Sequence, residues 1–554
     1  MKTTAQEPET LPSVEALLAL LEVAPADAEK LSFSHKSPIQ VRRYAETLAK
    51  LDPAPRAQKL YAAIKEVVAL KESPEQRIKL LGIFHSQLTG TAQTLIEQTS
   101  VSRDANKVIS LALALLKHLY SGYKQVIVSS ASLDTANTGL LTNSIFSAVT
   151  VVNELFTCYW RHHLSPPASL WQELHSLFRL AQEYGLEDQR VSFVSTSGKP
   201  NATIRNAYLK ILLAGSVCPP HYNAGELKQI LQFIDDWAHL AKFGTAKQRK
   251  LFLVDPSANY GPVYRTRIKA IREAHISLCP KKLVSALQDR CVKSDSGVEY
   301  ITVPDRLATD LSQLWSQENL RQEDHSKSKG AVDLVAGIDD IHRMLTGTEF
   351  GEEFFASLQQ DANPAPEPSA SVAGHWRYPS FRCEYLDQSE FGCCIEADGL
   401  REALAPGEIV VLIDPETEQQ LSGVIRWAHN TNELKTRVGI QKFTGDLKAC
   451  AVRLTRETTP ITPYLPAFTI VSDTPKDGVH LLAPSGPLKM HNQIHMVNDQ
   501  QEAYFVLNDK VEMTYHVSLF KITPEARSIS RSKTRPKTRA KTKTNNELKT
   551  PYDQ

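Results

Sequence analysis

The sequence predicts a multidomain α+β protein, with a large all-α N-terminal region followed by a small antiparallel β-barrel and further C-terminal β structure. Three observations support this fold class. Apolar residues recur at helical spacing from Ser13 to about residue 245. A segment of alternating proline and small residues, D-A-N-P-A-P-E-P-S-A-S at 361–371, is typical of a linker. Beyond it, short apolar runs alternate with turn residues, as in small barrels.

The length and composition exclude several classes of protein. At 554 residues the chain is long enough for several domains, and its net charge of +1 gives no overall preference for nucleic acid or acidic membranes. The eight cysteines form no C-x-x-C pair, which argues against zinc and favours free thiols in a reducing cytoplasm. The N-terminus has no signal-peptide pattern, and the apolar runs at 108–119 and 145–152 are too short to span a bilayer. We therefore expect a cytoplasmic protein without a transmembrane segment.

The N-terminal region is expected to consist of helices throughout. Residues 1–12 are polar and are predicted to be disordered, and the helical domain follows at 13–245. Asp52-Pro53-Ala54-Pro55 separates two helices, and Pro74 stands in the first turn of the next. The strongly apolar segments 105–120 and 140–163 are predicted to form the centre of this domain. A mixed segment, 246–360, and the linker, 361–374, complete the part before the barrel.

Nothing in the sequence indicates an enzyme, a catalytic residue, a metal or a cofactor. The chain has no G-x-S-x-G, phosphate loop, H-E-x-x-H or dinucleotide fingerprint. His162, His163 and His175 are better explained as ordinary histidines, since neighbours on a helix point about 100° apart. The paired carboxylates Asp235-Asp236 and Glu352-Glu353 are expected on solvated helix faces.

A D-x-S-x-x-G motif opens the predicted barrel. Asp387, Ser389 and Gly392 lie between an apolar lead-in and a short strand. A carboxylate accepts hydrogen bonds, a hydroxyl donates or accepts one, and a glycine lets a ligand approach the backbone. The alternative for this motif is a turn that caps a hairpin. Three further strand patterns follow the motif, at 409–413, 422–427 and 437–443.

This order of motifs resembles the PilZ domain, the bacterial receptor module for cyclic di-GMP. The resemblance covers about 382–452, and we place the barrel at 375–455. It implies that Asp387, Ser389 and Gly392 contact cyclic di-GMP. PilZ receptors also carry R-x-x-x-R before their first strand, with arginines that bind the phosphates. Here only Arg377 and Arg382 are available for that role, and they are one residue too far apart. The resemblance therefore implies a degenerate ligand motif.

A basic cluster in the mixed segment offers another source of cations. Arg265, Lys269 and Arg272 would share one face if 265–272 were helical, with Arg267 beside them. Such a face is either simply solvated or supplies the missing arginines to the barrel.

The C-terminal part contains more β structure and a basic tail. Strand patterns at 456–525 favour a separate subdomain. Residues 526–554 are rich in lysine and arginine with almost no apolar side chains, so we expect a disordered tail. The tail is consistent with a nucleic-acid arm, a contact with anionic lipid, or a solubilising extension.

The sequence thus favours a non-enzymatic bacterial signalling protein that is a cyclic di-GMP receptor or effector, with an unknown protein partner. The alternative is a degenerate PilZ-like protein-interaction module on a helical scaffold, which does not bind the nucleotide.

Overall fold

The computed structural model describes most of the chain and divides it into two compact units. It describes residues 12–23, 25–98, 105–131, 137–191, 202–248, 250–294, 297–318, 326–360, 379–399, 404–431, 435–456, 459–471, 478–499 and 502–525. The first unit comprises Met1–Ile341, Tyr378–Phe443 and Met513–Val517. The second comprises His342–Arg377, Thr444–Glu512 and Ser518–Gln554. The predicted linker at 361–374 and the C-terminal tail lie outside the described residues.

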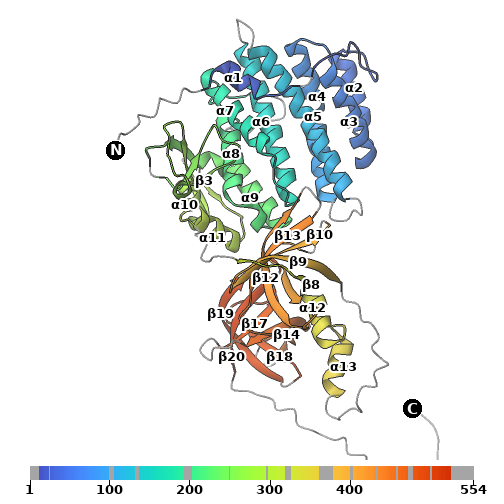
Figure 1. The fold of residues 1–554 in the computed structure, drawn as a ribbon, viewed down its shortest axis with the longest axis vertical. Helices are drawn as coiled ribbons and strands as arrows, with labels where there is room; N and C mark the ends of the chain where they lie inside the picture. Colours follow the sequence, from blue (N-terminus) through green and yellow to red (C-terminus); the bar gives the residue numbers. More distant parts are fainter. Residues whose placement is uncertain are drawn as a thin grey trace, which may run out of the picture. The chain divides into compact units, whose positions relative to one another are not determined.

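The N-terminal helical region is confirmed (Figure 1). Its helices are α1 (Val14–Ala19), α2 (Pro38–Leu48), α3 (Pro53–Ala69), α4 (Pro74–Gln98), α5 (Ala105–Ala131), α6 (Thr138–Arg161), α7 (Ala168–Glu183), α8 (Ile204–Ser216) and α9 (Ala224–Trp237). Two short 3₁₀ turns, η3 (Pro219–His221) and η4 (Ala238–Leu240), flank α9. Proline occupies the first turn of α2 and α3, where its missing N–H costs no helical hydrogen bond.

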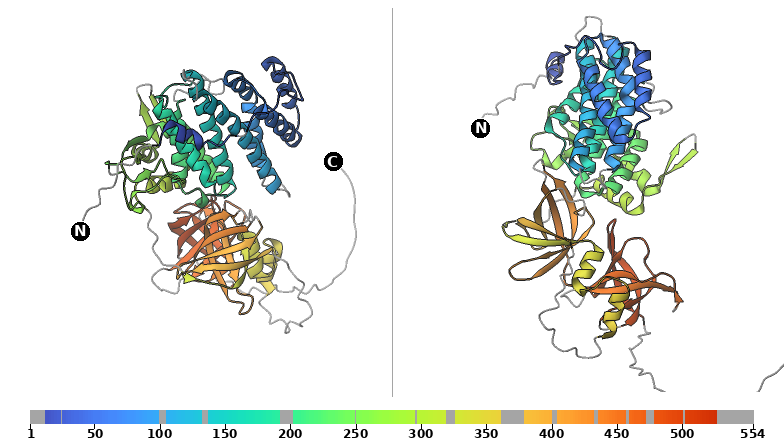
Figure 2. Two further views of the ribbon diagram at one scale, coloured as in Figure 1. Left: turned by 45° about the horizontal axis from the view of Figure 1, so that its top comes forward. Right: turned by 90° about the vertical axis from the view of Figure 1, so that its right-hand side faces the viewer.

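The longest helices form the core of this region. α4, α5 and α6 pack against one another, as both views in Figure 2 also show. α6 is long and apolar enough to cross a membrane, but 72% of its most apolar window is buried inside the structure. Phe156 of α6 packs edge-on against Trp171 of α7, with ring centroids 4.4 Å apart. α6 therefore has the burial of a core helix.

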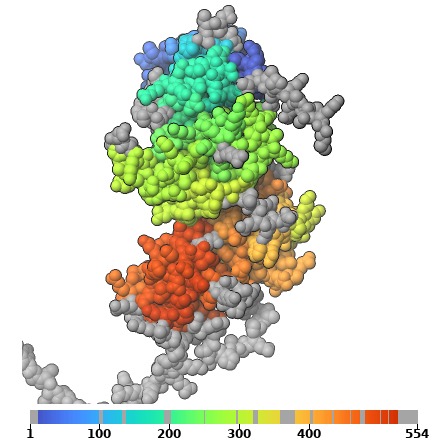
Figure 3. All heavy atoms as spheres, turned by 90° about the vertical axis from the view of Figure 1, so that its left-hand side faces the viewer, coloured from blue at the N-terminus to red at the C-terminus, as the bar shows by residue number. Residues whose placement is uncertain are grey.

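A mixed segment continues the same core. Strands β1 (Lys242–Thr245), β2 (Phe252–Val254), β3 (Val263–Tyr264) and β4 (Ile276–Cys279) form an antiparallel sheet in the order β1-β4-β2-β3. Helices α10 (Lys281–Asp289) and α11 (Asp305–Leu314) flank a hairpin of β5 (Cys291–Ser294) and β6 (Gly297–Tyr300). One hydrophobic cluster extends from Leu21 to Trp315. Figure 3 accordingly shows the blue-to-green residues as one continuous surface.

The first barrel is a closed antiparallel ring. It pairs β8 (Ala331–Ala336), β9 (Ser380–Gln388), β10 (Gly392–Asp398), β13 (Lys435–Lys442), β12 (Gln420–Asn430) and β11 (Ile409–Ile413), with β11 returning to β8. A short strand, β7 (Ser326–Lys327), adds to β9. The bounds 375–455 are therefore not those of this barrel. Its first strand precedes the proline-rich segment, because that segment lies in an insertion between the first two strands.

The second barrel forms a separate ring. It pairs β14 (Leu447–Arg456), β16 (Leu465–Val471), β17 (Val479–Pro484), β20 (Val517–Pro524), β19 (Glu502–Met513) and β18 (Gln493–Val497), and β18 returns to β14. β15 (Thr459–Pro460) extends β14. The predicted separate C-terminal β structure is confirmed, although β14 had been assigned to the first barrel.

The two rings share one strand order. Numbered along the chain within each barrel, both run 1-2-3-6-5-4 around the ring. The insertion in the first barrel carries α12 (Ile338–Thr346) and α13 (Glu352–Gln360). Within the second unit, Phe354 of α13 is buried in a cluster with Ala451 and Val497 of the second barrel.

Candidate functional site

The D-x-S-x-x-G motif forms the connection between β9 and β10. The backbone N–H of Ser389 donates to the carbonyl oxygen of Gly392 at 2.8 Å. The Ser389 hydroxyl is 3.4 Å from the same oxygen. On the β13 side, Lys442 donates from its backbone N–H to Phe391 O and from Nζ to Ser389 O, both at 2.9 Å. Hydrogen bonds from β10 and from β13 thus fix this connection. The hydroxyl oxygen of Ser389 can still accept a hydrogen bond.

Asp387 lies on the outer face of the barrel. The neighbouring strand β10 directs Cys393 and Ile395 into the core, so Cys394 between them points outward. Asp387 pairs with Cys394 and therefore shares its face. The same pairing continues through Gly439 of β13 to Trp427 of β12.

On its other side, Asp387 pairs with Lys327 of β7. One row on the outer face therefore contains a cation, a carboxylate, a thiol, a glycine and an indole from five adjacent strands. We call Lys327, Asp387, Cys394, Gly439 and Trp427 the outer row.

Two β-bulges end on this row. The register of β9 against β10 shifts between Cys394 and Ile395, which leaves Leu386 as an extra residue beside Asp387. The register of β12 against β13 shifts between Ile425 and Trp427, which leaves Arg426 as the extra residue. A bulge redirects side chains and is frequent beside functional sites. Ile425 and Ala428 both lie in the core, so the bulge leaves Arg426 and Trp427 between two inward side chains.

The structure separates Arg382 from the motif. Arg382 lies on β9 five residues before Asp387, which is about 17 Å along an extended strand. Its Nη1 is 3.1 Å from Oδ1 of Asp333, and its side chain is 58% exposed. Arg377 lies outside the described residues. The assignment of these two arginines to the ligand stays a prediction.

Sequence reasoning missed two lysines that precede the first strand of the barrel. The family's basic motif precedes the first strand, and that strand is β8, not a strand after the linker. Immediately before β8 stand Lys327 and Lys329, both exposed. The alternating V-D-L-V-A of 332–336 was the signal that could have revealed β8.

The basic cluster at 265–272 is not a helix and its arginines are engaged locally. η5 covers only Arg265–Arg267. Arg265 donates to the Ala246 carbonyl at 2.9 Å, and Arg272 pairs with the Asp255 carboxylate. Arg267 lies 3.4 Å from Glu318. The predicted shared helical face is therefore wrong.

The first barrel contacts the helical region through β12. Asn430 donates from its backbone N–H to His163 O and from Nδ2 to His162 O, both at 2.7 Å. The hydroxyl of Ser165 is 2.8 Å from Nε2 of His429. Burial lowers the pKa of His162 and of His163 to about 4, so both are neutral at pH 7. This contact joins neutral polar groups to the strand that carries Trp427.

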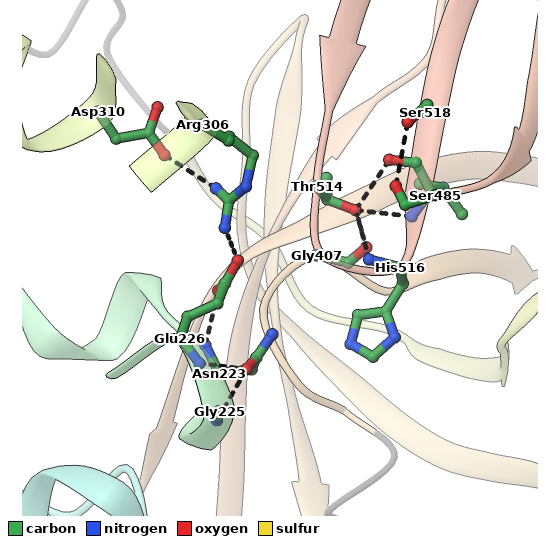
Figure 4. A network of polar contacts seen from close by, with 11 residues as sticks. Asn223, Gly225, Glu226, Arg306, Asp310, Gly407, Ser485, Thr514, His516 and Ser518 are labelled. Atoms are coloured by element: carbon green, nitrogen blue, oxygen red, sulfur yellow. Dashed lines mark hydrogen bonds and ion pairs between the residues drawn. The ribbon is translucent and has the colours of Figure 1, made fainter. Parts of the chain in front are cut away.

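Further polar groups of the same unit surround the start of α9 (Figure 4). Asn223 caps α9 reciprocally with Glu226, and Arg306 of α11 pairs with Glu226 and, at 2.8 Å, with Asp310. Burial raises the pKa of Asp310, while Arg306 and Arg426 oppose that shift. In the turn at 514–516, Thr514 donates to Gly407 O at 2.7 Å. These bonds tie α9 to α11 of the mixed segment, and the turn at 514–516 to Gly407 of the first barrel.

Of the three histidines considered as metal ligands, His175 has other hydrogen-bond partners. His175 is 2.7 Å from the Tyr208 hydroxyl and 2.9 Å from Tyr260 O. Within the described ranges, no group of three or more His, Cys, Asp or Glu side chains could hold a metal ion.

Comparisons with known proteins point to one family. The model of the N-terminal domain of the cyclic-di-GMP receptor FimW matches residues 39–248, and the model of its middle PilZ domain matches 251–376 and 356–445. The cyclic-di-GMP receptor FimW of Pseudomonas aeruginosa PAO1 is 22% identical over 571 aligned positions, covering 90% of this chain and 93% of that relative. No solved structure matches.

Proposed function

This chain belongs to the cyclic-di-GMP receptor FimW family by its N-terminal and middle PilZ domains, and from that premise we propose that it binds cyclic di-GMP on the outer row of the first barrel. The observation that carries the proposal is the pairing of Asp387 with Lys327 on one side and Cys394 on the other. This pairing places the Asp387 carboxylate beside the Lys327 ammonium group on the outer face. The next two residues of the outer row, Cys394 and Gly439, have small side chains.

Each group of the motif has a chemical part in the proposal. Guanine presents adjacent N–H donors on its Watson–Crick edge, and the Asp387 carboxylate supplies two acceptor oxygens for them. The Ser389 hydroxyl oxygen adds an acceptor, and Gly392 has no side chain to obstruct the approach of the ligand. Arg382 and Arg377 remain further candidates for the phosphates.

The phosphates need cations, and two lysines beside the motif can supply them. Lys327 is exposed and shares the face of Asp387. Lys442 holds its ammonium group at the Ser389 carbonyl. An ammonium group acts on a phosphate as a point charge, without the bidentate fit of arginine. Lysines at these positions should therefore give weaker binding than the family's two arginines, and binding that depends strongly on salt.

The sequence of the second barrel lacks the serine of the motif. Its connection between the second and third strands reads D-T-P-K-D-G at 473–478, with aspartate and glycine at the same spacing. Pro475 replaces the serine there, and proline has neither a hydroxyl nor a backbone N–H. We therefore expect the nucleotide only on the first barrel.

We also propose that this chain is not an enzyme, because the matched family is one of receptors and binding a ligand requires no catalytic residue. The second candidate remains a protein-interaction module that has lost the nucleotide. The segment before β8 favours it, since R-Q-E-D-H-S-K-S-K-G at 321–330 contains one arginine and no R-x-x-x-R.

A nucleotide competition experiment separates the two candidates. The full chain is titrated with labelled cyclic di-GMP and then competed with unlabelled cyclic di-GMP, cyclic di-AMP or GTP. The receptor predicts displacement by cyclic di-GMP and not by cyclic di-AMP, because adenine presents an acceptor at the position of the guanine N1–H. Absence of saturable binding would leave the interaction module as the function.

A further inference from the structure

A turn near the C-terminus forms part of the first unit. Residues Met513–Val517 belong to that unit, whereas the rest of β19 and β20, the two strands that the turn joins, belongs to the second. The Thr514 hydroxyl organises the turn, since it accepts the backbone N–H of His516 at 3.2 Å and that of Val517 at 3.0 Å. Thr514 is 8% exposed, so its hydroxyl lies inside a packed contact.

Two adjacent residues of the first barrel bind this turn on one side and β12 on the other. The Thr514 hydroxyl donates to the Gly407 carbonyl oxygen at 2.7 Å (Figure 4). Nδ1 of His516 lies 2.9 Å from Oε1 of Glu408. Towards β12, the Gly407 N–H donates to Ile425 O at 2.8 Å, and the Ile425 N–H donates to Glu408 O at 2.9 Å. Gly407 and Glu408 therefore connect the turn to both backbone groups of Ile425.

The contact between the turn and Gly407 requires a glycine. The φ of Gly407 is +91°, in the left-handed region that favours this residue. A Cβ atom at this position would lie 3.1 Å from Cβ of Thr514 and 3.3 Å from its Oγ1. The turn and the Gly407 backbone are therefore packed so closely that a side chain at Gly407 would push the turn away.

The turn reaches the outer row through the bulge of β12. Ile425 is the last residue before this bulge, in which Arg426 is the extra residue and Trp427 joins the outer row. Arg426 directs its Nε to Gln441 Oε1 on β13 at 2.6 Å. A shift of register by one residue would move side chains of β12 to the opposite face of the sheet. The backbone bonds of Ile425 therefore help to fix which side chains of β12 point outward.

We propose that Thr514 and His516 are positioning residues for the nucleotide, which hold the bulge of β12, and with it the outer row, in the form that binds cyclic di-GMP. This inference rests on the proposed function. The two residues act through Gly407 and Glu408, without contact with the ligand. Coupling between two sites is reciprocal, so ligand on the outer row should in turn stabilise the turn at 514–516. The alternative is that the turn only stabilises the fold, in which case its loss would lower the melting temperature and leave the affinity unchanged.

The test is a calorimetric titration of the full chain and of two pairs of variants with cyclic di-GMP. Thr514→Val removes the hydroxyl and keeps the shape of the side chain, and it is expected to weaken binding about 2- to 12-fold through the loss of one hydrogen bond. Thr514→Ser keeps the hydroxyl and should bind like the wild type. His516→Leu should also weaken binding, whereas His516→Asn keeps a donor at the position of Nδ1 and should lose less. Thr455→Val is the matched control, because it removes a buried hydroxyl from β14 that has its own hydrogen bond.

Hydrogen exchange gives a second readout, which carries the test together with the His516 pair if Thr514→Val does not fold. Cyclic di-GMP should slow the exchange of the amides at 513–517 in the wild type and in Thr514→Ser, and should not slow it in Thr514→Val. The proposal is overturned if Thr514→Val keeps the wild-type dissociation constant, if Thr514→Ser weakens binding as much as Thr514→Val, or if the ligand leaves the exchange at 513–517 unchanged in the wild type. A wild-type chain that shows no binding would instead overturn the proposed function, and the inference with it.

Discussion

The ammonium group of Lys442 lies 2.9 Å from the carbonyl oxygen of Ser389, so a side chain from β13 holds the connection between β9 and β10. Ser389 and Lys442 are 53 residues apart in sequence and meet only in the closed barrel. A cation therefore stands at the motif that was first identified from its aspartate, serine and glycine.

We predict that Lys442→Met weakens cyclic di-GMP binding about tenfold or more, because a charge-assisted hydrogen bond is worth roughly 1.5–3 kcal/mol. The variant should also show a shallower dependence of binding on salt, since one fewer counterion is released. Titration at two salt concentrations measures both effects. Lys448→Met, at an exposed lysine of β14, is the control. Equal salt slopes in Lys442→Met and wild type would contradict this role.

The source of the other phosphate contact can be decided by two substitutions. Lys327→Ala should weaken binding more than Arg382→Ala, because Lys327 shares a row with Asp387 while Arg382 pairs with Asp333. Both side chains are exposed, so both variants should melt close to the wild-type temperature. A larger loss of affinity in Arg382→Ala than in Lys327→Ala would instead indicate that Arg382 contacts the phosphates.

Buried histidines predict a pH dependence of stability. The folded-state pKa of His85, His162, His163 and His175 is lowered to about 4 by burial, from the ordinary 6.5. Between these two values the unfolded chain binds protons that the folded chain does not. Stability should therefore be full above about pH 6.5 and decline as the pH falls towards 4, by up to about 1.4 kcal/mol per pH unit for each histidine.

Urea unfolding at pH 7.0 and 5.5 checks this dependence. The midpoint should be lower at pH 5.5, and unfolding there should take up protons, which calorimetry in two buffers of different ionisation enthalpy detects. A midpoint that does not change over this range would show that these histidines are not held neutral by the fold.

The C-terminal tail is predicted to be dispensable for folding, since 527–543 has almost no apolar side chains. A chain ending at Glu525 should have the same melting temperature as the full chain. The tail does contain R-x-x-x-R spacings, at Arg527, Arg531, Arg535 and Arg539. If lysines of the barrel bind the phosphates, truncation should leave the affinity unchanged at physiological salt. A marked loss of affinity on truncation would assign the phosphates to the tail.

The sequence predicted what depends on local patterns. Helical periodicity identified α2 to α9, and the order of turn and strand motifs identified β10 to β13. The sequence did not reveal β8, because the partners of this strand, β9 and β11, lie far along the chain on the other side of a proline-rich insertion. The pairing register of the strands determines which residues form the outer row, and a bulge shifts that register by one residue. No sequence pattern could therefore place Trp427 on the row of Asp387. The cytoplasmic localisation stays a prediction.

The most direct test of the account is a calorimetric titration of the full-length chain and its Asp387→Asn variant with cyclic di-GMP. The substitution keeps the shape of the side chain while exchanging an acceptor oxygen for a donor amide, so the guanine N–H groups lose a partner. We predict saturable binding by the wild type, loss of about tenfold or more in affinity in Asp387→Asn, and wild-type affinity in Asp398→Asn, an exposed aspartate of β10. Absence of binding by the wild type, or equal affinity in Asp387→Asn, would contradict the assignment of the nucleotide to this face.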